Sequence, residues 1–358
     1  GGGGDEPAAS QVYVIGNGHS PQLSGEATPY DDDCLVVWED DQAGVVGASL
    51  QVNPDLTMAM TQPIVVGGGA DATEIAISKQ GGDVGLHVIT WVDRPAGMPG
   101  WIRAQVVDHD MNPMGPGAWL QNVPLDAGYP AVDGDGFHFF VAWEQQETLN
   151  PAAVDVLGRT ITVGPAGITS LGQVFDVAVY PGDLDGLPDV ARIGDRYGLV
   201  YQSGSSTQPF VDDCYYRTFT RAGTPIGPEF RLDVTITGNY AYEHAPRLVS
   251  KCDGDAASTS DHALVTFADQ DNRSAESNVG LQKVEAMGAG GAVVDLGGGC
   301  GPAGLCAVRG PCALGNDAFA IDLHGALPLA VPFLAVGFAG RPMLSCGVCS
   351  LVDPHLFQ

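Results

Sequence analysis

The chain has 358 residues and a formal charge of −28 at pH 7, from 43 acidic against 15 basic residues. A field of this sign repels nucleic acids and anionic lipid surfaces, so neither is an expected partner. No apolar stretch reaches the roughly 18 residues of a membrane-spanning helix, so no membrane insertion is expected.

Glycine is abundant, at 50 residues, and proline contributes another 25. No long window repeats its apolar residues with helical spacing. Short apolar runs separated by Gly, Pro, Asp and Asn indicate strands joined by turns, and therefore an all-β chain.

The N-terminal segment 1–18 reads as an acidic, glycine-led arm followed by one alternating strand, "SQVYVIGNG". Because the chain starts without a methionine, we expect a mature product whose leader has been removed. The strand has two possible partners: the last repeat of its own chain, or the open edge of a neighbouring copy. The residues of this predicted assembly strand are Gln11, Val12, Tyr13, Val14 and Ile15.

One strand pattern, an apolar run ending in an aromatic residue, recurs five times after this arm. The copies are "CLVVWEDD" at 34–41, "HVITWVD" at 87–93, "FFVAWEQ" at 139–145, "YGLVYQS" at 197–203 and "HALVTFAD" at 262–269. A short strand precedes each copy, at 21–23, 74–77, 130–132, 188–191 and 246–249. An alternating strand follows each copy, at 45–52, 101–108, 156–163, 214–221 and 279–286. A turn and a fourth strand complete the unit, as at 63–66 and 230–234.

Repetition of a four-stranded unit predicts a five-bladed β-propeller over residues 19–298. A single twisted sheet of four strands cannot bury both of its faces, so the blades must pack against one another. The aromatic residues at equivalent positions are then expected to fill the space between blades. They are Trp38, Trp91, Trp143, Tyr201 and Phe267.

Residues 299–358 change in character and predict a second, small, β-sandwich-like domain that carries disulfides. The eight cysteines are Cys34, Cys214, Cys252, Cys300, Cys306, Cys312, Cys346 and Cys349. An even number, most of them close to the C-terminus, favours disulfides and an oxidising compartment. Zinc is the alternative, since Cys346 and Cys349 have the two-residue gap of many zinc sites.

The stretch "LGNDAFAIDLHGALPLAVPFLAVGF", followed by "SLVDP", resembles a C-terminal module of large secreted bacterial proteins. That module runs "GN-x-x-F-x-L-x-L-x-GA-x-P", and the "LVVWED" repeats resemble those that precede it. The resemblance implies a secreted β-propeller-type repeat protein, extracellular or at the cell surface, and it assigns no chemistry. Such modules continue beyond the final strand seen here, so we expect this domain to lack a strand.

The innermost predicted strands offer three weak catalytic candidates, Glu74, Asp133 and Asp189. Glycosidases use two carboxyl groups roughly 5–10 Å apart, and propellers place ligands where their inner strands converge. The first repeat has Gln22 where an acid would complete the set, and the fifth has Arg247. Glu39 and Glu144 share the position after the tryptophan and form a weaker pair.

Acidic residues spaced two apart in glycine-rich segments predict a calcium site, because Ca²⁺ binds six to eight oxygen atoms. The predicted ligands are Asp183, Asp185, Asp133, Asp135, Asp269 and Asp271. The alternative is that these residues only form turns. Asn272 begins a single N-glycosylation sequon.

These patterns favour a structural or binding role over catalysis. The first hypothesis is an extracellular assembly protein that forms head-to-tail homopolymers, as filaments or a surface layer, through strand complementation. The second is a carbohydrate-binding propeller, whose partner is a glycan. A glycoside hydrolase or lyase comes third.

Overall fold

The computed structural model describes thirteen segments of the chain. They are residues 18–24, 33–52, 58–147, 153–178, 184–205, 208–232, 241–250, 262–271, 277–285, 304–309, 320–324, 340–345 and 348–352. They divide between two compact units, 1–286 and 287–358. This division lies earlier in the chain than the boundary expected at residue 299.

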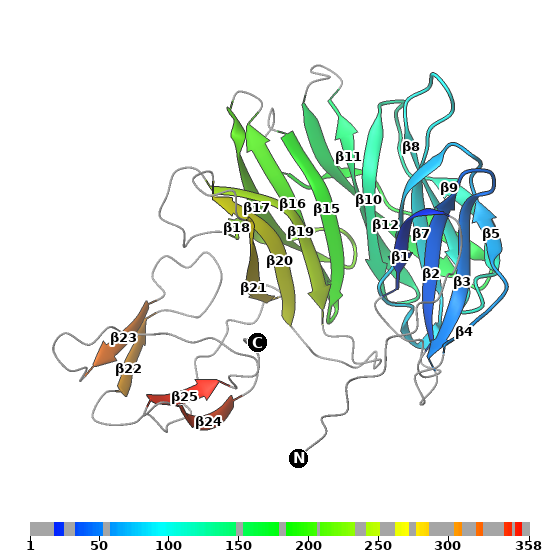
Figure 1. The fold of residues 1–358 in the computed structure, drawn as a ribbon. Coiled ribbons are helices and arrows are strands. Elements are labelled where there is room, and N and C mark those ends of the chain that lie inside the picture. The colour runs from blue at the N-terminus through cyan, green and yellow to red at the C-terminus, as the bar shows by residue number, and fades with distance from the viewer. Residues whose placement is uncertain are drawn as a thin grey trace, which may run out of the picture. The chain divides into compact units, whose positions relative to one another are not determined.

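The first unit consists of five successive groups of antiparallel strands (Figure 1). Group 1 contains β1 (His19–Leu23), β2 (Asp33–Asp40), β3 (Gly44–Val52), β4 (Met58–Met60) and β5 (Ile64–Gly67). Group 2 contains β6 (Ala72–Ile77), β7 (His87–Asp93), β8 (Trp101–Val107) and β9 (Pro113–Trp119), with a short 3-10 helix at Gly82–Val84. Group 3 contains β10 (Ala127–Gly134), β11 (His138–Gln146), β12 (Val154–Gly164), β13 (Gly167–Leu171) and β14 (Phe175–Asp176).

Group 4 contains β15 (Leu184–Ile193), β16 (Arg196–Ser205), β17 (Gln208–Thr220) and β18 (Pro225–Arg231). Group 5 contains β19 (Ala241–Ser250), β20 (His262–Asp271) and β21 (Ser277–Glu285). A single parallel bridge, Val154 with Leu184, joins groups 3 and 4 into one sheet. The described part of the second unit holds two hairpins, β22 (Gly304–Arg309) with β23 (Ala320–His324) and β24 (Gly340–Ser345) with β25 (Val348–Val352).

The all-β, propeller-like fold expected from the repeats is confirmed. The first strands of the groups, β1, β6, β10, β15 and β19, are neighbours in that order. No helix in the described ranges is long and apolar enough to cross a membrane.

One strand assignment was wrong. The fourth strand of group 4 lies at Pro225–Arg231, not at 230–234, because β17 turns back at once through Thr220. There, the Gly223 and Thr224 amides both bond Thr220, the first to its carbonyl and the second to its hydroxyl oxygen. The prediction began this strand five residues too late, at 230 and not at 225.

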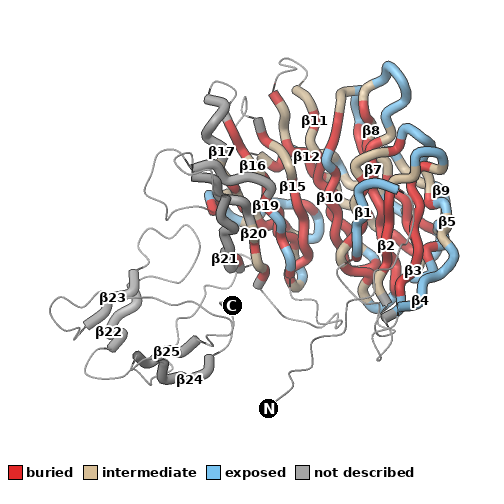
Figure 2. Tube along the Cα trace, viewed as in Figure 1, coloured by how far each residue is buried: buried red, intermediate tan, exposed pale blue. Residues whose placement is uncertain are grey.

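Hydrophobic cores lie between successive groups, as the band of buried strands in Figure 2 indicates. Trp91 of group 2 clusters with Leu35 and Val37 of group 1. Trp143 of group 3 clusters with Val88 and Ile102 of group 2. Each tryptophan therefore packs against the preceding group.

Tyr201 follows the same rule. It clusters with Phe140 and Ala142 of the group before it, and its side chain is 1% exposed. Trp38 is also buried, whereas the side chain of Phe267 lies outside the described residues. The aromatic residues that recur in the sequence are thus core residues wherever the structure describes them.

Trp143 provides a test of this packing. Trp143→Ala should lower the free energy of unfolding by about 3–5 kcal/mol, because it empties a fully buried site between two groups. Trp143→Phe should cost much less, since it keeps an aromatic ring and removes an indole N–H that lacks a partner among the described residues. Urea denaturation followed by circular dichroism measures both changes.

The control for this test is Trp119→Ala, which truncates a tryptophan that is 44% exposed. It should shift stability by no more than about 1 kcal/mol. Equal losses for the two alanine variants would show that Trp143 does not hold groups 2 and 3 together.

Candidate functional site

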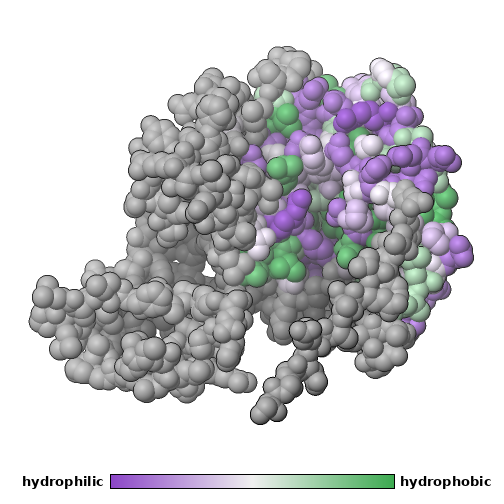
Figure 3. All heavy atoms as spheres, in the orientation of Figure 1, coloured by the Kyte–Doolittle hydropathy of each residue, from purple (hydrophilic) through white to green (hydrophobic). Residues whose placement is uncertain are grey.

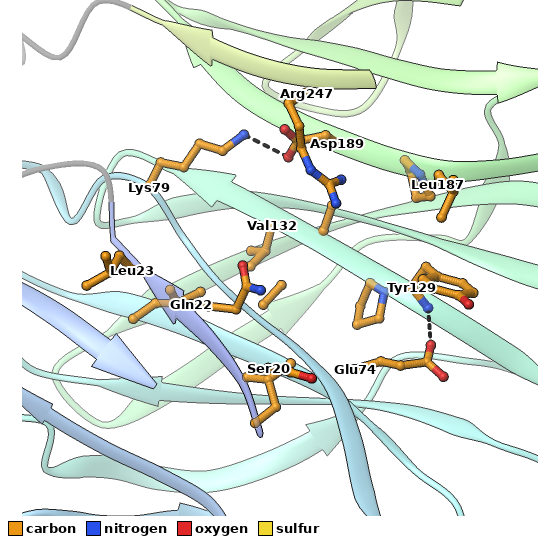
Figure 4. A pocket seen from close by; sticks show the side chains of 16 residues that line it. Ser20, Gln22, Leu23, Glu74, Lys79, Tyr129, Val132, Leu187, Asp189 and Arg247 are labelled. Atoms are coloured by element: carbon orange, nitrogen blue, oxygen red, sulfur yellow. Dashed lines mark hydrogen bonds and ion pairs between the residues drawn. The ribbon is translucent and has the colours of Figure 1, made fainter. Parts of the chain in front are cut away.

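A pocket of about 330 Å³ opens where the first strands of all five groups meet. We call it the central pocket, and Figure 4 shows it from close by. Its polar and aromatic lining residues include Gln22, Glu74, Lys79, Tyr129, Asp189 and Arg247. On the face of the molecule seen in Figure 3, hydrophilic and hydrophobic residues interleave.

The backbone beside the pocket is irregular in the same way in every group. The pairing register shifts within β1, β6, β10, β15 and β19. At the shift, four residues other than glycine adopt positive φ angles: Ser20 (49°), Glu74 (54°), Tyr129 (47°) and Leu187 (48°). Such a conformation costs on the order of 1 kcal/mol or more at each residue. A repeated β-bulge therefore directs these residues and their successors to the pocket.

Carboxylates bind the backbone N–H groups at these bulges. Glu39 Oε1 accepts a hydrogen bond from the Glu74 N–H at 2.6 Å. Glu74 Oε2 accepts one from the Tyr129 N–H at 2.6 Å, and Glu144 Oε1 accepts one from the Leu187 N–H at 2.6 Å. In each case the carboxylate belongs to the preceding group. We call Glu39, Glu74 and Glu144 the bulge carboxylates.

Two glycines let the bulge carboxylates come this close. A Cβ atom at Gly128 would lie 2.8 Å from Glu74 Oε2, and one at Gly186 would lie 2.5 Å from Glu144 Oε1. Any side chain at either position would displace the carboxylate from the N–H that it binds.

A second set of hydrogen bonds, separate from those at the bulges, also links the groups of strands. Asp133 Oδ1 accepts from the Gln80 N–H at 3.1 Å, and its Oδ2 accepts from the Arg192 N–H at 2.7 Å. One fully buried carboxylate thereby connects groups 2, 3 and 4. Asp189 Oδ2 accepts from the Leu248 N–H at 2.7 Å and connects group 4 to group 5.

Lys79 reaches from group 2 to groups 4 and 5. Its Nζ lies 2.7 Å from Asp189 Oδ1 and donates to the carbonyl oxygens of Val190 and Leu248, each at 2.6 Å. The Lys79 and Asp189 side chains are only 20% and 12% exposed. All three N–H bonds of the ammonium group are used, and the charge of Asp189 is neutralised (Figure 4).

Burial shifts the pKa values of two of these acids upward. Desolvation raises the pKa of Glu144 to about 7; the hydrogen bond from Leu187 opposes the shift and the charge of Glu74 adds to it. Desolvation likewise raises the pKa of Asp133 to about 6, against the charge of Lys79 and three backbone hydrogen bonds.

The structure separates the three catalytic candidates. Glu74 and Asp189 line the central pocket, whereas Asp133 does not. Both oxygens of Asp189 are engaged, one by Lys79 and one by a backbone N–H. Glu74 binds the Tyr129 N–H, and its other oxygen lies 3.7 Å from an Arg94 nitrogen.

Of the six predicted calcium ligands, Asp133, Asp135 and Asp185 have side chains that the structure describes. Among the described residues, no three His, Cys, Asp or Glu side chains form a cluster suited to a metal ion. Both oxygens of Asp133 bind backbone N–H groups, and Asp135 binds the Phe137 and His138 amides and pairs with Arg221 at 3.1 Å. Asp185 is buried in β15.

Several predicted residues cannot be compared in full. Asp183, Asn272 and the assembly strand 11–15 lie outside the described residues, as do the side chains of Asp269 and Asp271. Cys214 is buried in β17 and Cys34 is partly buried in β2. Of the other cysteines only the backbones of Cys306 and Cys349 are described, within strands β22 and β25. The disulfides and the calcium site stay predictions.

Sequence reasoning missed Lys79 and Tyr129. A repeated signal was available, because the dipeptides Ser20-Pro21, Tyr129-Pro130, Leu187-Pro188 and Ala245-Pro246 recur in the first strands of four repeats. Proline cannot donate to a ladder, so its recurrence inside these strands marks a bulge. For Lys79 no comparable signal exists, since it has no equivalent in the other repeats.

No protein-family model matches the sequence, and no curated protein matches it. The fold is similar to solved structures at low identity. An α-L-arabinanase from Penicillium chrysogenum, complexed with arabinobiose, is 17% identical with a TM-score of 0.47, over 72% of this chain and 79% of that one. An α-L-arabinofuranosidase from Fusarium graminearum, in complex with an iminosugar inhibitor, is 11% identical with a TM-score of 0.44, over 74% and 92%.

An endo-arabinase from Bacteroides thetaiotaomicron is 10% identical with a TM-score of 0.40, over 74% of this chain and 93% of that one. At identities and TM-scores this low, the similarity carries no argument about function. The function of this chain is therefore inferred from its own residues.

The pKa of Glu144 predicts a pH-dependent stability. Its folded-state value of about 7 lies above the ordinary 4.5, so the folded state binds a proton that the unfolded state releases. The resulting stabilisation is present below about pH 4.5 and is lost as the pH rises through about 7. Relative to Glu144→Gln, the natural protein should therefore lose about 3 kcal/mol between pH 4.5 and pH 8. Urea titrations at both pH values measure it, and a constant difference would contradict the assignment.

A double-mutant cycle tests the Lys79–Asp189 pair. Lys79→Met should destabilise the fold by about 3 kcal/mol, because it leaves the Asp189 charge buried without a partner. Lys79→Met with Asp189→Asn should cost at least about 1 kcal/mol less than the sum of the single changes. Strictly additive losses would show that the two side chains do not interact.

Proposed function

We propose that residues 19–285 form a five-bladed β-propeller that binds a saccharide in the central pocket. The observation that carries the proposal is the pocket itself, to which the first strand of every group contributes residues. Its volume of about 330 Å³ lies at the lower end of the roughly 300–1,000 Å³ found for small-molecule sites.

The lining supports a sugar as the ligand. A pyranose or furanose ring presents C–H groups on its faces and hydroxyl groups, which donate and accept hydrogen bonds, around its edge. Tyr129 is 52% exposed and offers an aromatic ring, with Leu23 as a second exposed apolar side chain. Gln22 and Ser20 are exposed at the same pocket and supply donors and acceptors. An aromatic ring with nearby polar groups is suited to both kinds of sugar surface.

Binding is favoured over hydrolysis because the pocket carboxylates are already engaged. A glycosidase needs one carboxyl group as an acid and another as a base or nucleophile. Asp189 is paired with Lys79 and Glu74 supports the Tyr129 bulge. Hydrolysis is the second candidate, since Glu74 and Asp189 both line the pocket. Head-to-tail assembly stays a hypothesis that rests on the strand at 10–18 and on the C-terminal domain.

A glycan array followed by isothermal titration calorimetry tests the proposal. We expect Tyr129→Ala to weaken saccharide binding at least tenfold, because stacking of a sugar face on an aromatic ring is worth about 1.5 kcal/mol. Phe137→Ala removes an aromatic ring of comparable exposure, 44%, that does not line the pocket, and it should leave affinity unchanged. Arabino-oligosaccharides belong in the array, since arabinobiose is the ligand in one of the structures named above.

Product analysis by anion-exchange chromatography, on the saccharides that bind, distinguishes the two candidates. Intact ligand after long incubation supports binding alone. Release of shorter sugars that stops in Glu74→Gln would favour hydrolysis. The absence of any bound saccharide would overturn the proposal.

A further inference from the structure

Arg247 is a basic residue of the central pocket, and its charge has no partner among the residues that the structure describes. It lies on β19, is exposed, and extends over the pocket in Figure 4. Within the described part of the chain its guanidinium group has no ion pair or hydrogen bond. In this respect it differs from Lys79, whose ammonium group has three acceptors within 2.7 Å.

The other ionised groups that line the pocket are engaged, and Arg94 beside it is shared between Glu74 and Asp126. Lys79 neutralises Asp189 at 2.7 Å. Glu74 faces Arg94 at 3.7 Å and accepts the Tyr129 N–H. Among the described residues that line the pocket, the guanidinium group of Arg247 is therefore the charge without a partner.

The setting of this cation makes it selective. The chain as a whole has a formal charge of −28, so its long-range field opposes anions in general and multiply charged anions most. A guanidinium group binds a planar carboxylate with two parallel N–H···O bonds. A sugar unit whose only charge is one carboxylate gains this bond at a smaller cost in repulsion than a sulfated or more highly charged unit.

We propose that the saccharide bound in the central pocket is a hexuronic acid, whose carboxylate is held by Arg247. The sugar face lies against the Tyr129 ring, and its hydroxyl groups bond the polar residues at the rim. This inference rests on the proposed saccharide binding and names its chemical class.

The test uses oligosaccharides of galacturonic, glucuronic and mannuronic acid, each beside its carboxyl-reduced counterpart. Reduction replaces the carboxylate by a neutral hydroxymethyl group and leaves the rest of the sugar unchanged. By calorimetry, we expect at least one acidic oligosaccharide to bind about 10- to 100-fold more tightly than its reduced form. A sulfated oligosaccharide serves as a more highly charged comparison, and it should bind more weakly.

Variants of Arg247 identify the carboxylate partner. Arg247→Gln should remove the preference for the acidic sugar, so that the acidic and the reduced sugar bind the variant with similar affinity. Arg247→Lys keeps the charge but not the two parallel donors, so it should retain only part of the preference. Arg196→Gln removes the same charge from β16, at a residue that pairs with Asp195 and does not line the pocket, and should have no effect. Thermal unfolding checks that each variant is folded.

The outcomes separate the two proposals. If the reduced sugars bind as tightly as the acidic ones, or if Arg247→Gln keeps the preference, saccharide binding stands and the carboxylate assignment is wrong. Tighter binding of the sulfated sugar would also overturn that assignment. If neither acidic nor neutral saccharides bind the full chain, both proposals fail.

Discussion

The structure depends on which acceptors bind the backbone N–H groups where the first strands of the groups meet. A bulge places a residue with positive φ beside the central pocket and removes its N–H from the sheet ladder. An N–H that is buried without an acceptor costs about 1–3 kcal/mol. Glu39, Glu74 and Glu144 supply the acceptor, each from the preceding group. The same bonds that relieve the bulges therefore also hold neighbouring groups together.

This arrangement explains why a ring of acids need not be catalytic. Asp133 and Asp189 play a similar part, because they accept hydrogen bonds from backbone N–H groups of neighbouring groups of strands. Lys79 then offsets the charge of Asp189 and ties group 2 to groups 4 and 5. A carboxylate with both oxygens engaged by fixed donors is poorly suited to transfer a proton. The acids of the inner strands are best understood as connections between groups.

Two residues of the central pocket, Tyr129 and Arg247, have exposed side chains. The Tyr129 ring is exposed although its backbone is held by Glu74, and Arg247 is exposed without an ion pair among the described residues. Their common position at the mouth of one pocket is the basis of the proposed saccharide binding.

The sequence by itself determined the all-β class, the order of the strands and the buried positions of Trp38, Trp91 and Trp143, because alternation and burial are local properties of a strand. It also identified Glu74 and Asp189 as inner-strand acids. It did not reveal that these acids accept hydrogen bonds from the backbone of other groups. Contacts between groups join residues far apart in the sequence: Lys79 and Asp189 are 110 residues apart, and Gln80 and Ser250 are 170 apart. Which N–H meets which carboxylate depends on the packing of one group against the next and on a bulge that shifts the register. Only the tertiary structure decides those contacts, because they join residues that lie far apart in the sequence.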